Sequence, residues 1–176
     1  LLEYIHDFII FDGGVKKAAR PNQYFAVKAA QPRVRKKQNG IIWHSQGSGK
    51  SLTMIWLARW IRENVSDARV VIITDRDELD KQIESGFKDA GEQIQRAKSG
   101  GKLIEMLNAA EPWLICTLIH KFGNKNDGDA ISVGNKKASK SLDLYLEELA
   151  KSLPADFRAK GNIYVFIDEC HRTQGG

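Results

Sequence analysis

Residues 44–51 have the types and spacing of a loop that binds a polyphosphate. They read His44-Ser45-Gln46-Gly47-Ser48-Gly49-Lys50-Ser51. The segment lies between a short apolar run, residues 41–43, and a longer helix-like run, residues 52–60. Glycines let successive backbone N–H groups point inward around phosphates, and the helix that follows adds the positive end of its dipole. The backbone of Gly47, Ser48 and Gly49 is therefore expected to surround the phosphates of a nucleotide.

Two side chains of this loop carry the specific chemistry. Lys50 is expected to reach the β- and γ-phosphates, and the hydroxyl of Ser51 to bind Mg²⁺. The usual pattern begins with glycine or alanine, whereas this chain has His44 at that place. A Gly/Ser turn with an incidental lysine is the alternative interpretation, and the strand-like and helix-like flanks argue against it.

A second chemical signature follows the apolar run 163–167 near the end of the chain. Asp168 and Glu169 supply the acidic pair that a phosphate loop needs before it can hydrolyse anything. Asp168 would help to hold Mg²⁺, and Glu169 would polarise the attacking water. Acidic residues after a strand can also be mere caps of the next helix. Because both segments occur in one chain and in this order, together they predict a site for ATP and Mg²⁺.

Helix-like and strand-like segments alternate around these two signatures. Strands are expected at 41–43, 69–74, 113–117 and 164–167. Helices are expected at 1–11, ended by Asp12-Gly13-Gly14, and at 21–30, 52–60, 75–90, 103–110 and 142–153. This order predicts an α/β fold with a parallel sheet covered by helices on both faces.

The composition is that of a globular protein with a modest positive charge. The chain has 176 residues, 42% of them hydrophobic and 28% charged, and a net charge of +5. The apolar runs are far shorter than the roughly 20 residues of a membrane span, and the N-terminus does not resemble a signal peptide. Cys116 and Cys170 cannot form a disulfide framework. A reducing cytosol and no membrane partner are therefore expected.

The densest positive charge, residues 33–37, reads Arg33-Val34-Arg35-Lys36-Lys37. It is expected in a loop before the first strand of the sheet, where it could contact nucleic-acid phosphates. A solvated loop is the simpler interpretation and the one that the charge pattern favours.

These residues carry a family resemblance. Asp168-Glu169-Cys170-His171 resembles the DExH box of superfamily 2 helicases and translocases. Residues 42–54 and 168–174 resemble more narrowly the motor (R) subunit of type I restriction–modification enzymes, in which the first loop position is commonly histidine. Thr74 to Gln82 is similar to motif Ia of that family, Thr117 to Phe122 to its next DNA-facing segment, and Arg20 to Gln23 to the Q motif.

The resemblance implies a P-loop NTPase of the RecA-like kind, working as an ATP-driven motor on double-stranded DNA. Lys50, Ser51, Asp168 and Glu169 carry over as ATP and Mg²⁺ residues, and Gln23 as the residue that contacts the adenine edge. Thr74, Arg76 and Thr117 carry over as phosphate-directed DNA contacts, and His171 as the residue that couples ATP state to DNA grip. For Arg76, a salt bridge with Asp77 or Asp80 is an equal alternative. The implied partners are the methyltransferase and specificity subunits of a type I complex.

The same resemblance divides the chain and shows where it departs from the family. Residues 1–37 are expected to form an N-terminal helical segment with the Q-like motif, and residues 38–176 a first RecA-like lobe, incomplete at its C-terminus. A nuclease signature, the second motor lobe and the strand that follows the DExH box are not found in the sequence. This piece alone is therefore expected to hydrolyse ATP weakly or not at all. Another superfamily 2 helicase and a regulatory nucleotide-binding module are the alternatives.

Overall fold

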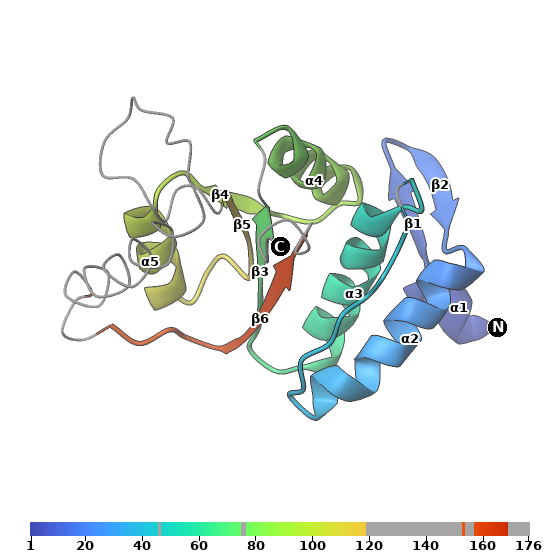
Figure 1. Cartoon of the computed structure of the whole chain (residues 1–176), viewed down its shortest axis with the longest axis horizontal. Helices are drawn as coiled ribbons and strands as arrows, with labels where there is room; N and C mark the ends of the chain where they lie inside the picture. Colours follow the sequence, from blue (N-terminus) through green and yellow to red (C-terminus); the bar gives the residue numbers. More distant parts are fainter. Residues whose placement is uncertain (46, 75–76, 119–152, 154–156, 169–176) are drawn as a thin grey trace, which may run out of the picture.

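The central sheet is parallel and carries the strongest sequence signals. The computed structural model describes residues 1–45, 47–74, 77–118, 153 and 157–168 (Figure 1). Within these residues the larger sheet has the strand order β4-β5-β3-β6, with every neighbouring pair parallel. The strands are β3 (Ala68–Thr74), β4 (Gln95–Ala97), β5 (Leu114–Leu118) and β6 (Asn162–Ile167). The predicted strands 69–74, 113–117 and 164–167 are confirmed. The strand β4 was missed because three residues are too few to show a pattern.

Helices cover both faces of this sheet, as predicted. On one face lie α3 (Lys50–Asn64) and α4 (Asp77–Asp89), and on the other lies α5 (Gly100–Asn108). Alternate residues of β3 enter the two cores: Val70 and Ile72 pack with α3 and α4, and Val71 packs with α5. Because β3 is buried on both faces, its sequence is apolar without alternation. The chain is an α/β RecA-like lobe.

The N-terminal segment differs from the predicted helix 1–11. The helix α1 spans only Leu2–Asp7, and β1 (Ile9–Asp12) then pairs antiparallel with β2 (Val15–Ala18). The two-residue turn has φ of +57° at Gly13 and +80° at Gly14. Turns with two positive φ angles match the twist of a hairpin, so this glycine pair reverses the chain instead of ending a helix.

The second helix is longer than predicted. The helix α2 (Pro21–Arg35) passes through Pro32 and packs alongside α3 (Figure 1). The basic residues 33–35 therefore form its last turn, and Lys36 caps it. The expected loop is therefore wrong for residues 33–35 and begins only with the turn at Lys36 and Lys37, because backbone hydrogen bonds continue past the proline, as from Lys36 N to Pro32 O at 3.1 Å.

The expected strand at residues 41–43 is absent. Ile41, Ile42 and Trp43 form an irregular segment and are 79%, 42% and 84% exposed. Within the part of the chain that the structure describes, β6 pairs only with β3, so no neighbouring strand offers this segment its hydrogen bonds. A strand depends on its partner for backbone pairing.

One buried arginine connects several segments at the amino end of the sheet. Arg69, at the start of β3, is 2% exposed and donates hydrogen bonds to five backbone carbonyls. These belong to Met106, Leu107, Ala109, Pro112 and Lys160, at 2.7, 2.9, 2.8, 2.8 and 3.3 Å. Burial lowers the pKa of Arg69, and the charge of Glu111 opposes that shift. The guanidinium thus ties the C-terminal end of α5 to β3 and to the segment before β6.

One prediction falls outside the described part of the chain: of the expected helix 142–153, only Leu153 is described. Among the described residues no helix is both long and apolar enough to cross a membrane.

Candidate nucleotide site

The predicted phosphate loop is a turn that leads directly into α3. Gly47 and Gly49 have φ of +75° and +83°, a left-handed conformation that favours glycine. Ser48 Oγ donates to Ser45 O at 2.7 Å and closes the turn. Lys50 is the first residue of α3 and Ser51 the second. Gly49 is the N-cap and gives no side-chain cap, which leaves the first amides of α3 to another acceptor, as an anion site requires.

Gln23 is the residue that fixes this loop in place. It is 2% exposed, in the first turn of α2, and its Oε1 accepts a hydrogen bond from Arg20 N at 2.8 Å. Its Nε2 donates to Ser48 O and to Gly49 O, both at 3.1 Å. A carboxamide nitrogen has two N–H donors, so both are engaged by the loop. The structure therefore places the predicted adenine reader on the phosphate loop itself.

The same contact explains why position 49 is glycine. A Cβ on Gly49 would lie 2.3 Å from Gln23 Nε2, whereas a Cβ on Gly47 would meet nothing within 4 Å. A side chain at position 49 would therefore displace the Gln23 amide, in addition to the strain at its φ angle. The sequence signal for this clamp is a glutamine three residues after the N-cap Arg20, where it satisfies the cap amide.

The acidic half of the site begins where β6 ends. Asp168 is 9% exposed, and its backbone N donates to Ile73 O of β3 at 3.0 Å. Because β3 and β6 are parallel, Asp168 lies at the carboxyl end of the sheet. The first turn of α3 lies at that same end in Figure 1. Glu169 and His171 lie outside the described residues.

The predicted DNA contacts occupy the carboxyl ends of the next two strands. Thr74 ends β3, and Thr117 is the penultimate residue of β5. Both are 1% exposed, and Thr117 Oγ1 donates to Ala97 O at 3.5 Å. Thr74 Oγ1 is buried and has no hydrogen-bond partner among the residues that the structure describes. Arg76 lies outside the described residues. Contact of these residues with DNA stays a prediction.

His44, the unusual first position of the loop, is half-buried. Its Nδ1 is buried and, like Thr74 Oγ1, makes no hydrogen bond in the part of the chain that the structure describes. Buried polar atoms without partners cost about 1–3 kcal/mol each and are uncommon outside functional regions. Other buried atoms of this kind, such as Gln31 Nε2 and Trp113 Nε1, lie elsewhere in the described residues, so unpaired atoms alone do not mark the functional end.

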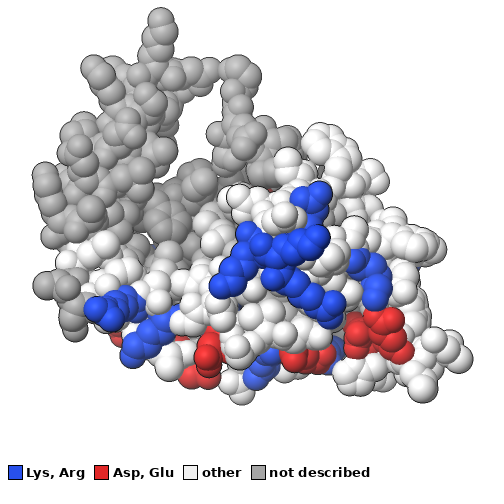
Figure 2. Space-filling model, turned by 90° about the horizontal axis from the view of Figure 1, so that it is seen from below, with Lys and Arg blue, Asp and Glu red and all other residues white. Residues whose placement is uncertain are grey.

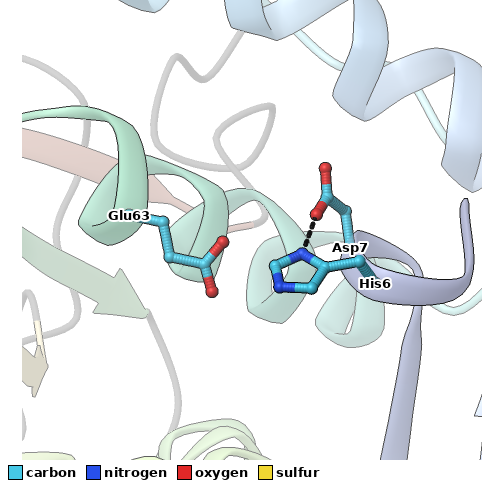
Figure 3. A group of neighbouring side chains, drawn as sticks. All are labelled: His6, Asp7 and Glu63. Atoms are coloured by element: carbon cyan, nitrogen blue, oxygen red, sulfur yellow. Dashed lines mark hydrogen bonds and ion pairs between the residues drawn. The ribbon is translucent and has the colours of Figure 1, made fainter. Parts of the chain in front are cut away.

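A separate group of His6, Asp7 and Glu63 joins α1 to the last turn of α3 (Figure 3). Their ligand atoms lie within 4.8 Å of one another, and His6 Nδ1 is 2.5 Å from Asp7 Oδ1. The hydrogen bond and charge of Asp7, and then the charge of Glu63, raise the pKa of His6. One nitrogen and two carboxylates can bind a divalent cation, but Glu63 is about 20 Å along α3 from Lys50 at 1.5 Å per residue. The group is therefore not part of the nucleotide site.

The fold and the loop together define the class of the protein. Residues 22–176 match the SWI2/SNF2 ATPase family, and the chain belongs to it. It is a lobe of the ATPase and helicase type, which uses a nucleotide.

More particular similarities lie within restriction enzymes. A protein of Methanocaldococcus jannaschii, MjaIXP, whose name makes it a candidate type I restriction endonuclease subunit, is 34% identical over 100% of this chain. The SauCOLORF180P type I restriction enzyme endonuclease subunit of Staphylococcus aureus is 30% identical over 90% of the chain, and the HindI subunit of Haemophilus influenzae 26% over 100%. The matched regions cover 16%, 15% and 16% of these relatives. The resemblance to type I motor subunits is confirmed.

Proposed function

We propose that this chain is the first ATP-binding lobe of a double-stranded DNA translocase in a type I restriction complex. One observation carries the proposal: the glycine loop opens α3 at the end of the sheet where Asp168 follows β6. Parallel sheets bind ligands at the carboxyl ends of their strands. The complete protein would couple ATP hydrolysis to movement along DNA, together with methyltransferase and specificity subunits in the cytoplasm.

Each predicted residue has a role in this proposal. The amides of residues 47–51 surround the phosphates, and Lys50 neutralises the β- and γ-phosphates. The Ser51 hydroxyl and the Asp168 carboxylate are hard oxygen donors, which fits Mg²⁺. Bound Mg²⁺ would supply neutralisation of charge on the γ-phosphate. Glu169 orients and polarises the attacking water.

Gln23 would link base recognition to the loop. In the structure its amide holds the carbonyls of Ser48 and Gly49. An adenine edge would compete for the same amide, so binding of the base would change how tightly the loop is held. In this proposal residues 1–37 act as the segment that senses the base, and residues 38–176 as the lobe that binds the phosphates.

DNA would be held at the same end of the sheet. Thr74, Arg76 and Thr117 would contact phosphates of one strand, which gives the sequence independence that a motor needs. His171 would transmit the ATP state to this contact. Because Thr74 and Thr117 are buried in the structure, their contact with DNA requires the surrounding segments to open.

The test is ATP hydrolysis by the complete protein with and without duplex DNA, and displacement of a third strand from a triplex as the measure of translocation. We expect hydrolysis to depend on DNA, and Lys50→Ala to lower its rate at least about 10²-fold, the usual cost of losing one charge-stabilising group. Hydrolysis at full rate without DNA would count against the motor. Unchanged ATP affinity and turnover in Lys50→Ala would refute the site.

A further inference from the structure

The last turn of α2 ends in an arrangement that places a lysine where glycine is usual. Gln38 N donates to Arg33 O at 2.9 Å, and Lys37 N donates to Val34 O at 3.0 Å, the two bonds of a Schellman motif. The left-handed residue of the motif is Lys37, with φ of +53°. A residue with a Cβ is disfavoured there relative to glycine. A backbone outlier of this kind suggests that the side chain has a use.

Four cations gather at this turn: Arg33, Arg35, Lys36 and Lys37. All four are exposed. The ion pairs formed within the described residues, such as Lys28–Glu3 and Arg62–Glu92, include none of them. Figure 2 shows the molecule from the side on which α2 ends, with Lys and Arg side chains gathered in the middle of the face and acidic ones along its lower rim.

Three of these side chains are held in position by uncharged partners. Arg35 stacks over the ring of Trp60, with Cζ 5.2 Å from the centroid. Arg33 Nη1 donates to Asn39 O at 3.2 Å, and Lys37 Nζ approaches Asn162 Oδ1 at 3.5 Å. These contacts restrict the side chains without neutralising them, which lowers the entropy lost when they meet a polyanion.

This surface lies at the opposite end of the sheet from the phosphate loop. Asn162, which Lys37 contacts, is the first residue of β6, whereas Asp168 follows its last residue. Two further exposed cations, Arg158 and Lys160, precede β6 in the same segment. Two exposed acids of the described residues lie at this end as well: Asp67, whose backbone O accepts from Asn162 N at 2.8 Å, and Glu111, whose charge acts on Arg69. The balance of charge along this edge is positive.

We propose that this surface, defined by Arg33, Arg35, Lys36 and Lys37, is a second contact for the phosphates of duplex DNA. The choice of DNA as the polyanion rests on the proposed function. Within the run 33–37 the apolar residue is Val34, which packs against the core, so the run itself offers nothing to insert into a lipid layer. A contact here would hold duplex that the nucleotide end of the lobe does not reach, without reading its sequence.

The test measures binding of a labelled blunt duplex to the complete protein by fluorescence anisotropy, without nucleotide, over a series of salt concentrations. Two variants are compared, Lys37→Gly and the double variant Lys36→Gln with Lys37→Gly. Each lost phosphate contact should reduce the slope of log K on log salt by about 1, so the slope falls by about 1 and about 2. Lys16→Gln, which neutralises an exposed lysine in the β1–β2 hairpin, is the matched control and should leave the slope unchanged.

Thermal unfolding separates this role from a structural one. Because glycine fits the left-handed position, Lys37→Gly should keep or raise the Tm while it weakens DNA binding. A fall in Tm that parallels the loss of binding would overturn the proposal.

Three other results would also overturn it. These are an unchanged slope in both variants, an equal loss in Lys16→Gln, and loss of subunit assembly while duplex binding is retained, which would assign the surface to an acidic protein. Failure of the proposed function looks different: hydrolysis would not respond to DNA, although the slopes still fell as expected.

Discussion

The two ends of β3 differ in whether their buried polar side chains are hydrogen-bonded. At the amino end, Arg69 is buried and its donors reach five carbonyls of three different segments. At the carboxyl end, Thr74 Oγ1 is buried with no hydrogen-bond partner in the described part of the chain. Nearby, one carboxamide, that of Gln23, holds the phosphate loop.

The two ends of β3 therefore contribute differently to the free energy of folding. The carbonyls that accept hydrogen bonds from Arg69 include those at the C-terminal end of α5, where the helix dipole favours a cation. Hydrogen bonds to a charged group have a net contribution of about 1.5–3 kcal/mol each when considered singly. Along β3, the buried guanidinium of Arg69 is thus hydrogen-bonded at the amino end, whereas Thr74 Oγ1 at the carboxyl end has no partner among the described residues.

Replacing Arg69 should have the largest effect on stability. In Arg69→Met, five backbone carbonyls lose a buried donor, and we expect a loss of about 3–5 kcal/mol in the free energy of opening around β3 and α5. Native-state hydrogen exchange of the α5 amides in the complete protein measures it. Arg62→Met is the matched control, since Arg62 is exposed and pairs with Glu92 and the Trp113 ring, and it should cost about 1 kcal/mol or less. Equal losses of stability in Arg69→Met and Arg62→Met would contradict the proposed difference between the buried and the exposed arginine.

At the carboxyl end of the sheet, substitution of two glycines of the phosphate loop should have an effect of intermediate size on stability. Gly47 and Gly49 share a left-handed φ, so alanine costs about 1–2 kcal/mol at either position. Only at position 49 would the new Cβ also displace the Gln23 amide from the loop carbonyls. We therefore expect Gly49→Ala to lower protection of the first hydrogen-bonded amide of α3, Thr53 N, which donates to Gly49 O at 3.2 Å, by about 1 kcal/mol more than Gly47→Ala, measured by hydrogen exchange without nucleotide.

A double-mutant cycle isolates the contribution of Gln23. In a Gln23→Ala background the amide is already gone, so the difference between the two alanine variants should disappear. If it persists, the loop is held by something other than this side chain. Stability around α5 should be unaffected throughout, which keeps the two ends of the sheet separable.

The sequence predicted the parts of the fold that depend on local pattern. The apolar run around Val70 to Ile73 predicted the central strand, because a strand buried on both faces needs no alternation. The glycine loop and Asp168 were placed at one end of the sheet by the rule that parallel strands share a carboxyl end. Those inferences required no knowledge of distant contacts.

The parts that failed depend on partners far along the chain. Nothing local distinguishes Arg69 from a surface arginine, because its acceptors lie 37–91 residues away in sequence. Ile9 and Phe8 fit a helical spacing equally well, and only pairing with β2 selects the strand. Residues 41–43 have strand composition, yet they lack a partner among the described residues. Gln23 was predicted to contact adenine, which stays a prediction, and its bonds to the loop could not be read from a motif.

The smallest expected effect on stability comes from the exposed contact of His6 with Asp7 and Glu63. It shows how much less an exposed charge contributes than the buried Arg69. His6 on α1 faces Asp7 and Glu63, with Arg59 opposing them, and the net result is a raised pKa. A group with a raised folded-state pKa stabilises the fold below its unfolded value, about 6.5, and loses that contribution as pH rises through the folded value.

His6→Ala should therefore lower the Tm below about pH 6.5, and its effect should decrease as the pH rises above that value. The measurement is thermal unfolding of wild type and variant across this range. In Glu63→Gln, His6 should keep its hydrogen bond to Asp7. The contribution of His6 to the Tm should depend less on pH, because the variant removes the Glu63 charge on α3 that attracts His6 on α1. The shift should be small beside that of Arg69→Met, since His6 and Glu63 are exposed and water screens their charges. A difference between wild type and His6→Ala that is constant with pH would show that the ring acts by packing and not by charge.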